Sequence, residues 1–471
     1  MNINHRFEDI PEDDPFANDK LDREKIAKIL TSLIKSYSNG FVLSINGQWG
    51  TGKTTFIKMW QLYLVKDKFT TIYFNAWEND FESNPLVALL AELGAITRKE
   101  GNTFNSLLKK ASILSKSVVP ALIKGVASKY IDKEIFTEAL GKIAEGAMDI
   151  FKEEVDEYVK KKESLNEFRK ELEKYVSNNI DQKPLVLFID ELDRCRPNYA
   201  VELLEKVKHL FNVPGIVFVL SIDKIQLGNA IKGFYGSENI DSSEYLRRFI
   251  DLEFSLPAPN TEIFCSHLYR HFDFDGFFKN PQRPRSLEIA HDGRYFLEFA
   301  ILLFSRAQTT LRQQEKIMAR ARVALNSFAI NYYVLPVLFL YLLYAREFYP
   351  SFYKKLTLRQ EKPEQILIGF KETLPHQIGP SDESYDRFME LEVLLAATYD
   401  KFFRELHHSS EPIVTERDRL ILNIKPALDS TTDGSKFLSF YSTLIRTSIQ
   451  QLRISHLFEK IDLLESFVTS P

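Results

Sequence analysis

Cysteine is scarce in this chain of 471 residues, which contains only Cys195 and Cys265. Two cysteines cannot supply the disulfide framework of a small secreted domain or a metal site built on cysteine thiolates. The scarcity fits a reducing compartment. The first residues are acidic and polar, which argues against a signal peptide: Glu8, Asp9, Glu12, Asp13 and Asp14. We therefore expect a cytoplasmic protein.

An excess of positive charge is also missing. The chain has 61 Lys and Arg residues against 65 Asp and Glu residues, and its formal net charge is −4 at pH 7. Such a chain has no overall positive field that would indicate binding to nucleic acid. Net charge alone does not decide the matter, and contact with DNA or RNA stays open. Apolar residues make up 44% of the chain and aromatic residues 13%, which is enough core material for two or three packed units.

Long apolar runs are absent as well. A helix that crosses a bilayer needs about 20 mostly uncharged residues. The apolar stretch Ile113–Val126 is interrupted by Lys116, Pro120 and Lys124. The run Tyr332–Tyr344 is only about thirteen residues long, so we expect it to be a core helix or strand. We expect no membrane span, although Lys109, Lys110, Lys116 and Lys124 could still contact a membrane surface.

A glycine-rich turn lies between an expected strand and an expected helix. The apolar run Phe41–Ile45 is typical of a buried strand, and a helical pattern begins at Phe56. Between them the sequence has the pattern Gly-x4-Gly-Lys-Thr, within Gly47, Gln48, Trp49, Gly50, Thr51, Gly52, Lys53, Thr54 and Thr55. Glycines in this setting let backbone N–H groups surround phosphate oxygens at a helix N-terminus. The turn therefore predicts binding of a nucleoside triphosphate.

Two residues of this P-loop have specific expected roles. Lys53 would reach the β- and γ-phosphates, and the hydroxyl of Thr54 would ligate Mg²⁺. A second motif would complete the site, because the buried-strand pattern Pro184–Ile189 ends in Asp190 and Glu191. An Asp in this position can hold Mg²⁺, and the following Glu can polarise a water molecule for attack on the γ-phosphate. Alone this second motif is weak, but it becomes strong beside a P-loop.

The combination of segments resembles the KAP family of P-loop NTPases, a group named partly for a plasmid-encoded phage-exclusion protein. The matching segments are Asp19–Arg23, Asn46–Thr55, Phe74–Trp77, Pro85–Leu86, Asp190–Cys195, Pro197 and Phe218–Asp223. They extend the resemblance over roughly residues 10–325. One position departs from the family pattern, which frequently has Asp after the first acidic residue. Glu191 is the usual choice in the wider AAA+ relatives, so hydrolysis stays expected.

The expected fold class is α/β, with a P-loop NTPase parallel sheet of about five strands in an order like that of AAA+ and STAND proteins. The expected strands are Phe41–Asn46, Thr71–Asn75, Leu185–Asp190, Ile216–Ile222 and Leu252–Leu256, and a helix is expected at Glu202–Phe211. The first part of the core would comprise residues 1–80 and the second part residues 184–260. A helical insertion would occupy residues 81–183, and residues 261–471 would be mainly α-helical.

The insertion contains one long helical pattern. Over residues 147–176 the apolar positions recur at mostly helical spacing: Ile150, Phe151, Val155, Tyr158, Val159, Leu165, Phe168, Leu172 and Val176. The favoured interpretation is a solvated helix packed on one face. The sharper alternative is a helical hairpin that projects from the core and binds a partner.

Three further polar positions are candidates for the site. Asp223 follows the fourth strand, where related ATPases place a sensor of the γ-phosphate, with Ser221 as its neighbour. A helix N-cap is the alternative for Asp223. Arg248 precedes the fifth strand, where AAA+-like enzymes carry an arginine finger for the adjacent subunit, and a surface arginine is the alternative. Arg312 begins a helix that resembles the second sensor of the family.

These features favour an ATPase. No Asn-Lys-x-Asp element follows the fourth strand, which favours ATP over GTP, and Mg²⁺ would accompany it. The resemblance implies that hydrolysis drives conformational change or assembly in a multi-protein system, with defence against phage and other mobile elements as the setting. Partner proteins from the same defence operon and a homo-oligomer are then expected. The alternative is a nucleotide-gated scaffold with little turnover that presents the insertion to a partner. A nuclease or helicase acting alone has no supporting carboxylate cluster beyond Asp190 and Glu191.

Overall fold

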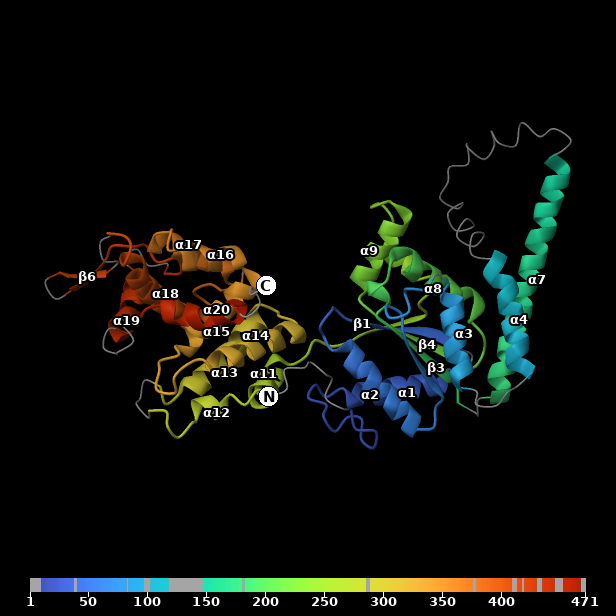
Figure 1. Ribbon diagram of the computed structural model, residues 1–471, viewed down its shortest axis with the longest axis horizontal. Coiled ribbons are helices and arrows are strands. Elements are labelled where there is room, and N and C mark those ends of the chain that lie inside the picture. The colour runs from blue at the N-terminus through green and yellow to red at the C-terminus, as the bar shows by residue number, and fades with distance from the viewer. Residues whose placement is uncertain are drawn as a thin grey trace. The chain divides into compact units, whose positions relative to one another are not determined.

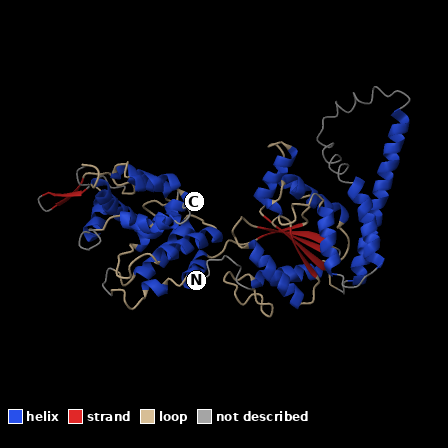
Figure 2. Cartoon of the chain, viewed as in Figure 1, coloured by secondary structure: helices blue, strands red, loops and turns tan. Residues whose placement is uncertain are grey.

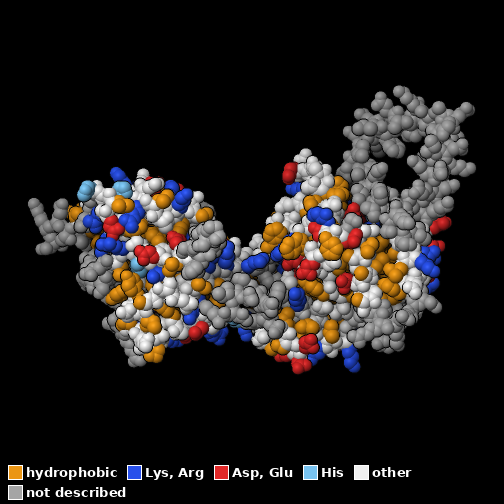
Figure 3. Space-filling view, in the orientation of Figure 1, with side chains coloured by type: hydrophobic (Ala, Val, Ile, Leu, Met, Phe, Trp, Pro, Cys, Tyr) orange, Lys and Arg blue, Asp and Glu red, His pale blue; other side chains and the backbone are white. Residues whose placement is uncertain are grey.

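The computed structural model describes residues 10–37, 40–82, 84–96, 102–117, 147–179, 183–284, 289–375, 378–408, 413–416, 419–429, 434–444 and 452–466. The chain forms two compact units, of which the first ends at Ala258 and the second begins at Pro259. Both units are rich in helix, and the large sheet belongs to the first of them (Figure 2). On the visible face of each unit, acidic and basic side chains are interspersed with apolar ones (Figure 3).

A five-stranded parallel sheet forms the centre of the first unit. Its strands are β1 (Phe41–Asn46), β2 (Thr71–Asn75), β3 (Leu185–Asp190), β4 (Ile216–Ile222) and β5 (Leu252–Ser255). They pair in the order β2-β3-β4-β1-β5, and every pairing is parallel. This order confirms the α/β class expected from the sequence. Only β5 differs from its expected range, because it ends at Ser255 and not at Leu256.

Helices cover both faces of the sheet, and alternate residues of each strand face opposite cores. On β3, Val186 and Phe188 pack with the first set of helices, while Leu187 packs with the second set. The first set is α1 (Glu24–Ser36) and α2 (Lys53–Lys66). The second set is α3 (Pro85–Ile96), α4 (Asn102–Ser117), α7 (Ala147–Asn179), α8 (Pro197–Leu210) and α9 (Lys224–Tyr235) (Figure 1). Burial on both faces explains why β1, β3 and β4 are almost uninterrupted apolar runs, whereas the edge strand β5 is largely exposed.

Several short elements complete the first unit. Helix α8 begins at Pro197, five residues before the expected start at Glu202, because proline fits the first turn of a helix, where its missing N–H costs nothing. A 3-10 turn, η1 (Leu192–Arg194), follows β3, and the short helix α10 (Ser242–Leu246) precedes β5.

The long helix of the insertion is confirmed in part. Helix α7 extends over residues 147–179 and lies beside α4 (Figure 1). Phe168, Leu172 and Val176 are buried in the core between the sheet and the second set of helices, as their helical spacing predicted. The side chains expected to continue this stripe toward residue 150, and residues 118–126 of the apolar stretch, lie outside the described part. In the parts of the chain that the structure describes, no helix is long and apolar enough to cross a membrane.

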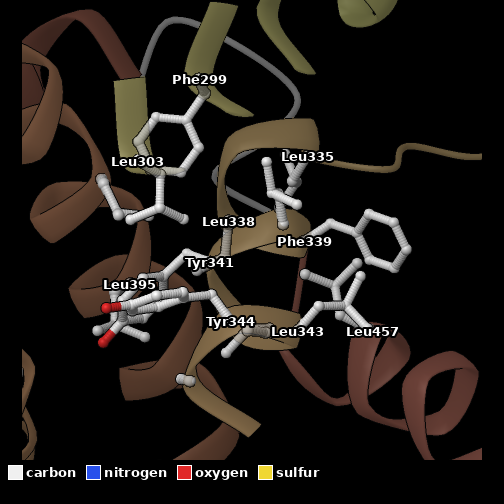
Figure 4. Packing of buried hydrophobic residues seen from close by; sticks show 14 of the residues in the cluster. Phe299, Leu303, Leu335, Leu338, Phe339, Tyr341, Leu343, Tyr344, Leu395 and Leu457 are labelled. Carbon is white, nitrogen blue, oxygen red and sulfur yellow. The ribbon is translucent and has the colours of Figure 1, made fainter. Parts of the chain in front are cut away.

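The second unit is built almost entirely from helices. These are α11 (Thr261–His271), α12 (Asp275–Phe278), α13 (Asp292–Arg306), α14 (Leu311–Leu325), α15 (Pro336–Phe348), α16 (Pro350–Leu358), α17 (Pro363–Thr373), α18 (Tyr385–Arg404), α19 (Ser435–Leu444) and α20 (Ser455–Ser466). Strands β6 (Ile413–Glu416) and β7 (Arg419–Leu422) form an antiparallel hairpin. The apolar run that begins at Tyr332 becomes α15, whose residues from Leu338 to Ala345 are buried (Figure 4).

We expect truncation of a side chain on α15 to destabilise the second unit strongly. Phe339 is fully buried, and Phe328 meets its ring edge-on at a centroid distance of 5.7 Å. Phe339→Ala should lower the free energy of unfolding by about 3–5 kcal/mol, because it removes buried apolar area and leaves a cavity. Urea titration followed by far-UV circular dichroism measures this loss. Ile368→Ala, at a position 58% exposed on α17, is the control, and an equal loss in both variants would contradict the assigned core.

Candidate nucleotide-binding site

The P-loop lies at the carboxyl end of β1 and has the backbone that its glycines allow. The N–H of Gly47 donates to the carbonyl of Ile222 at 3.1 Å, which ties the start of the loop to β4. Gly50 and Gly52 have φ angles of 78° and 81°, in the left-handed region that other residues rarely adopt. A Cβ on Gly47 would lie 3.1 Å from the hydroxyl oxygen of Thr51 and would narrow the loop. The loop therefore forms an open cradle, and larger side chains in place of these glycines would fill or distort it.

Helix α2 begins at Lys53, directly after the cradle, and no side chain of the described residues caps its first turn. The first N–H groups of a helix have no partner inside the helix and carry partial positive charge. A phosphate group is the anion that such an end binds most readily when a glycine-rich loop precedes it. The backbone of this segment therefore fits the polyphosphate of a nucleotide.

Lys53 is 8% exposed and lies among the functional groups of the site. Its ammonium donates to the carbonyl oxygens of Gly47 and Gln48, the latter at 3.1 Å. Burial lowers the pKa of Lys53, and four surrounding carboxylates oppose that effect: Asp193, Asp223, Asp190 and Glu191. The lysine is thus a buried cation at the base of the cradle.

Arg23 supports the P-loop by binding its backbone carbonyls, a role that the sequence did not reveal. Its guanidinium donates to the carbonyls of Gly52 at 2.8 Å and Thr51 at 2.6 Å, and only 4% of the residue is exposed. Asp19 accepts from the N–H groups of Leu21, Arg23 and Glu24, which fixes the start of α1. In the sequence the segment Asp19–Arg23 stands out only through a family pattern, whereas its hydrogen bonds show that it supports the P-loop.

The two acidic residues after β3 lie beside the P-loop. In the sheet, Asp190 pairs in register with Asn75 of β2 and Ser221 of β4. One carboxylate oxygen of Asp190 accepts from the hydroxyl of Tyr73 at 3.0 Å. Glu191 accepts from the Thr54 hydroxyl at 3.2 Å, although these residues are 137 positions apart. The fold thus brings the two predicted halves of the site together.

Glu191 has an unusual backbone and a perturbed carboxyl group. Its φ of 61° lies in the left-handed region, which is uncommon for residues other than glycine and is often found at functional sites. Burial raises the pKa of Glu191, and the nearby Arg194 opposes this effect. A carboxylate with raised basicity close to a phosphate-binding loop is suited to accept a proton from water.

The donor set at this point also fits a magnesium ion. Mg²⁺ prefers hard oxygen ligands and binds nucleotide sites through one or two protein groups together with phosphate oxygens. The hydroxyl of Thr54 and the carboxylate of Asp190 are such groups, and each lies next to Glu191 in the hydrogen-bond network. These two residues are the ones that would hold the ion.

Trp49 connects the P-loop to the segments that follow β3 and β4. Its ring N–H donates to the carboxylate of Asp193, and its backbone N–H donates to Asp223 at 3.2 Å. Burial raises the pKa of Asp193, and the Trp49 hydrogen bond opposes this effect. Sequence reasoning missed Asp193, because an Asp two residues beyond Glu191 has no signal of its own without the Trp49 contact.

Of the two alternatives that the sequence left open for Asp223, the structure shows the helix N-cap. Its side chain accepts from the N–H groups of Ile225 and Gln226 and therefore caps α9. The same carboxylate reaches the P-loop through Trp49. Ser221 is buried, and its hydroxyl has no hydrogen-bond partner among the described residues. A sensor role for either residue stays a prediction.

Of the remaining predicted residues, two belong to the P-loop segment and two arginines lie much later in the sequence. Within the loop, the Thr51 hydroxyl donates to the carbonyl of Gln48 at 2.7 Å, and Thr55 is half-buried in the first turn of α2. Arg248 is exposed in the turn between α10 and β5. Arg312 is exposed near the start of α14 in the second unit. The roles of both arginines stay predictions.

Comparison with known proteins agrees with this geometry. The model of the KAP family P-loop domain matches residues 23–323. The chain is 26% identical to the phage T7 exclusion protein of Escherichia coli K12 over 278 residues, which cover 54% of this chain and 34% of that protein. It is 31% identical to an uncharacterized protein of Methanocaldococcus jannaschii over 176 residues, 32% of this chain and 89% of that protein. The chain thus spans about a third of the length of the phage T7 exclusion protein.

Solved structures show only a distant likeness. The Aeropyrum pernix ORC2 protein is 12% identical with a TM-score of 0.33, over 90% of this chain and 94% of that chain. Drosophila ORC bound to GC-rich DNA and Cdc6 is also 12% identical, with a TM-score of 0.27 over 95% of this chain and 62% of that chain. These values carry no argument about function. The family match includes the P-loop, Asp190 and Glu191, and it shows that the chain belongs to the KAP family of P-loop NTPases.

Proposed function

We propose that this chain is an ATPase that binds ATP with Mg²⁺, hydrolyses it, and uses the cycle to drive conformational change or assembly in a multi-protein system. The contact between Thr54 and Glu191 is the observation that carries this proposal. It joins a phosphate-binding loop to an acidic pair that suits metal binding and water activation. The similarity to a phage exclusion protein supports a role in defence against phage or other mobile elements, with partner proteins from the same operon.

Each group of the site would have a separate task. The backbone N–H groups of the cradle and Lys53 would bind the polyphosphate, and Arg23 would keep the loop carbonyls turned away from it. Thr54 and Asp190 would hold Mg²⁺, which neutralises phosphate charge when bound. Glu191 would orient a water molecule and accept its proton. The hydrogen bond from Tyr73 would keep the Asp190 carboxylate in place.

A second candidate function is a nucleotide-gated scaffold, and the insertion favours it. Helix α7 has 33 residues and is therefore about 50 Å long. Its last turns are anchored, because the hydroxyl of Tyr175 donates to the carbonyl of Leu93 at 2.8 Å. An ion pair between Lys110 and Glu167 joins it to α4. A helical pair anchored beside the sheet suits presentation to a partner, and under this proposal ATP binding without turnover would suffice.

Removal of the P-loop lysine should abolish or severely weaken ATP binding. Lys53→Ala deletes the buried cation that would neutralise the β- and γ-phosphates, and the backbone amides cannot replace it. Isothermal titration with Mg·ATP measures the affinity. Lys28→Ala, which removes an exposed lysine paired with Glu24 on α1, is the control. Unchanged affinity and turnover in Lys53→Ala would refute the assignment of this loop.

Two conservative changes should separate binding from chemistry. Glu191→Gln should preserve ATP affinity but slow hydrolysis by about 100-fold or more, because an amide cannot accept the proton of water. Asp190→Asn should instead raise the Mg²⁺ concentration that supports half-maximal turnover. Steady-state phosphate release at several Mg²⁺ concentrations tests both. Glu171→Gln, at a surface ion pair of α7, is the control. Wild-type hydrolysis by Glu191→Gln would exclude its catalytic role.

Assembly gives a further prediction, because an arginine finger acts across a subunit boundary. If Arg248 serves this function, turnover per subunit should rise with protein concentration, and light scattering should detect ATP-dependent self-association. Arg248→Ala should lower turnover while it spares ATP binding. Mixing it with Lys53→Ala should partly restore activity, because the second variant supplies an intact finger.

Arg247→Ala is the matched control for this experiment. Arg247 is the neighbouring arginine, and its guanidinium pairs with Glu244 at 3.0 Å. Its removal should leave turnover unchanged. A monomeric protein whose turnover does not depend on concentration would leave Arg248 as a surface charge.

A further inference from the structure

Arg194 lies at the end of the 3-10 turn after β3 and contacts three side chains from separate segments, those of Glu191, Trp49 and Trp77. Its guanidinium forms an ion pair with the carboxylate of Glu191. The same guanidinium lies 5.7 Å from the ring centroid of Trp49 and 5.8 Å from that of Trp77. Its side chain is 28% exposed and that of Glu191 is 18% exposed. One cation therefore joins the candidate base to two tryptophans.

The two tryptophans come from separate segments with their own anchors. Trp49 is fixed in the P-loop by hydrogen bonds to Asp193 and Asp223. Trp77 follows β2, in a turn where its N–H donates to the side chain of Asn75 at 3.2 Å. Both tryptophans stay substantially exposed, 44% and 54%, so apolar burial alone does not explain their positions. Contact with a cation does, because aromatic faces attract a guanidinium.

A second link holds the Trp77 turn against the segment after β3. Arg196 donates its backbone N–H and its Nε to the carboxylate of Asp80, both at 2.8 Å. Asp80 is 9% exposed, so this bidentate contact is well shielded. The turn that carries Trp77 and the turn that carries Arg194 are thereby fixed to each other by a contact that does not involve Glu191. The surroundings of Arg194 are therefore held by a contact that is independent of the Glu191 carboxylate.

Glu191 needs such a support because of its backbone. Its left-handed φ of 61° places a flexible two-carbon side chain at a bend, and only Thr54 and Arg194 contact its carboxylate oxygens in the hydrogen bonds and ion pairs described here. Arginine suits the task because its planar group can pair with a carboxylate in its plane and stack on aromatic rings with its faces. Lysine supplies the charge but not the stacking geometry.

We propose that Arg194 is a positioning residue, which holds the carboxylate of Glu191 for water activation and is itself held by Trp49 and Trp77. The proposal rests on the proposed hydrolysis of ATP. Arg194 does not act on the nucleotide in this scheme. Its effect reaches the reaction only through Glu191, so it should change the rate of hydrolysis and not the binding of ATP.

Kinetics of three variants test the proposal. Arg194→Ala should lower kcat by about 10- to 100-fold while KM for ATP changes less than about 2-fold, because misplacement of a catalytic group by about 1 Å costs this much in rate. Arg194→Lys should recover part of the rate through its charge. Trp77→Leu should lower kcat by a smaller factor, because it keeps an apolar contact but removes the aromatic face. A distant structural defect would not produce this graded series.

Arg294→Ala is the matched control. Arg294 also combines an ion pair, with Glu298 at 3.7 Å, and an aromatic contact, with the ring of Tyr295 at 5.3 Å, but it lies in the second unit. Its removal should leave kcat unchanged. Wild-type kcat in Arg194→Ala would overturn the proposal and leave the proposed ATPase function intact.

Tryptophan fluorescence gives a readout that needs no turnover. The chain has three tryptophans, and the third, Trp60, is fully buried with its ring N–H bound to Thr31. Arg194→Ala should therefore increase quenching by acrylamide through Trp49 and Trp77 alone, and the increase should shrink in the Trp77→Leu background. Unchanged quenching would overturn the proposal. A wild-type chain that binds ATP without turnover would refute the proposed hydrolysis, and the quenching measurement would still decide whether Arg194 is held as described.

Discussion

The site depends on the position of β4 between β1 and β3. Parallel pairing on both sides of β4 aligns Asp190 with Ser221, and the same strand sets Ile222 beside the start of the P-loop. Carboxyl ends of parallel strands meet at one edge of a sheet, so the loops that follow them must share a small space. This arrangement makes Thr54 and Glu191 neighbours across 137 residues. Strands β3 and β4 are buried along their whole length, so a one-residue shift in their register would turn every side chain toward the opposite core and disrupt the packing of both.

Within that space the P-loop is held from several directions. Arg23 holds its carbonyls from the side of α1, and Trp49 connects it to Asp193 and Asp223. Hydrogen bonds of this kind, with one charged partner, contribute about 1.5–3 kcal/mol each when they are buried. A loop with positive φ at Gly50 and Gly52 would otherwise have many accessible conformations. The contacts restrict the loop to one of them, and a loop whose conformation is already restricted loses less entropy on binding.

The sequence predicted the parts of this site that have a regular local signal. The apolar runs and the glycine spacing located the strands and the P-loop, and Asp190 and Glu191 followed from their place after a buried strand. Periodicity also identified the stripe from Phe168 to Val176 on α7 and the buried helix α15. It could not reveal that Asp193 and Arg194 lie against the P-loop or that Trp77 lies against Arg194, because these contacts join segments far apart in the chain. The role of Arg23 was equally hidden. Nothing about one arginine in a polar segment indicates that it will be buried, with 4% of its surface exposed, and will donate to two backbone carbonyls.

The charges around Lys53 constrain how a nucleotide could enter the proposed site. Four carboxylates act on this lysine, and two of them, on Glu191 and Asp193, have raised pKa values because of burial. The nearby positive charges are those of Lys53 itself, Arg194 and Arg23, which binds the carbonyls of the loop. A triphosphate would bring several more negative charges into a partly desolvated space, where repulsion is weakly screened. The helix dipole and Lys53 offset only part of that charge. A divalent cation between the phosphates and Asp190 would offset much of the rest, so the electrostatics of the chain favour entry of the nucleotide together with its metal ion.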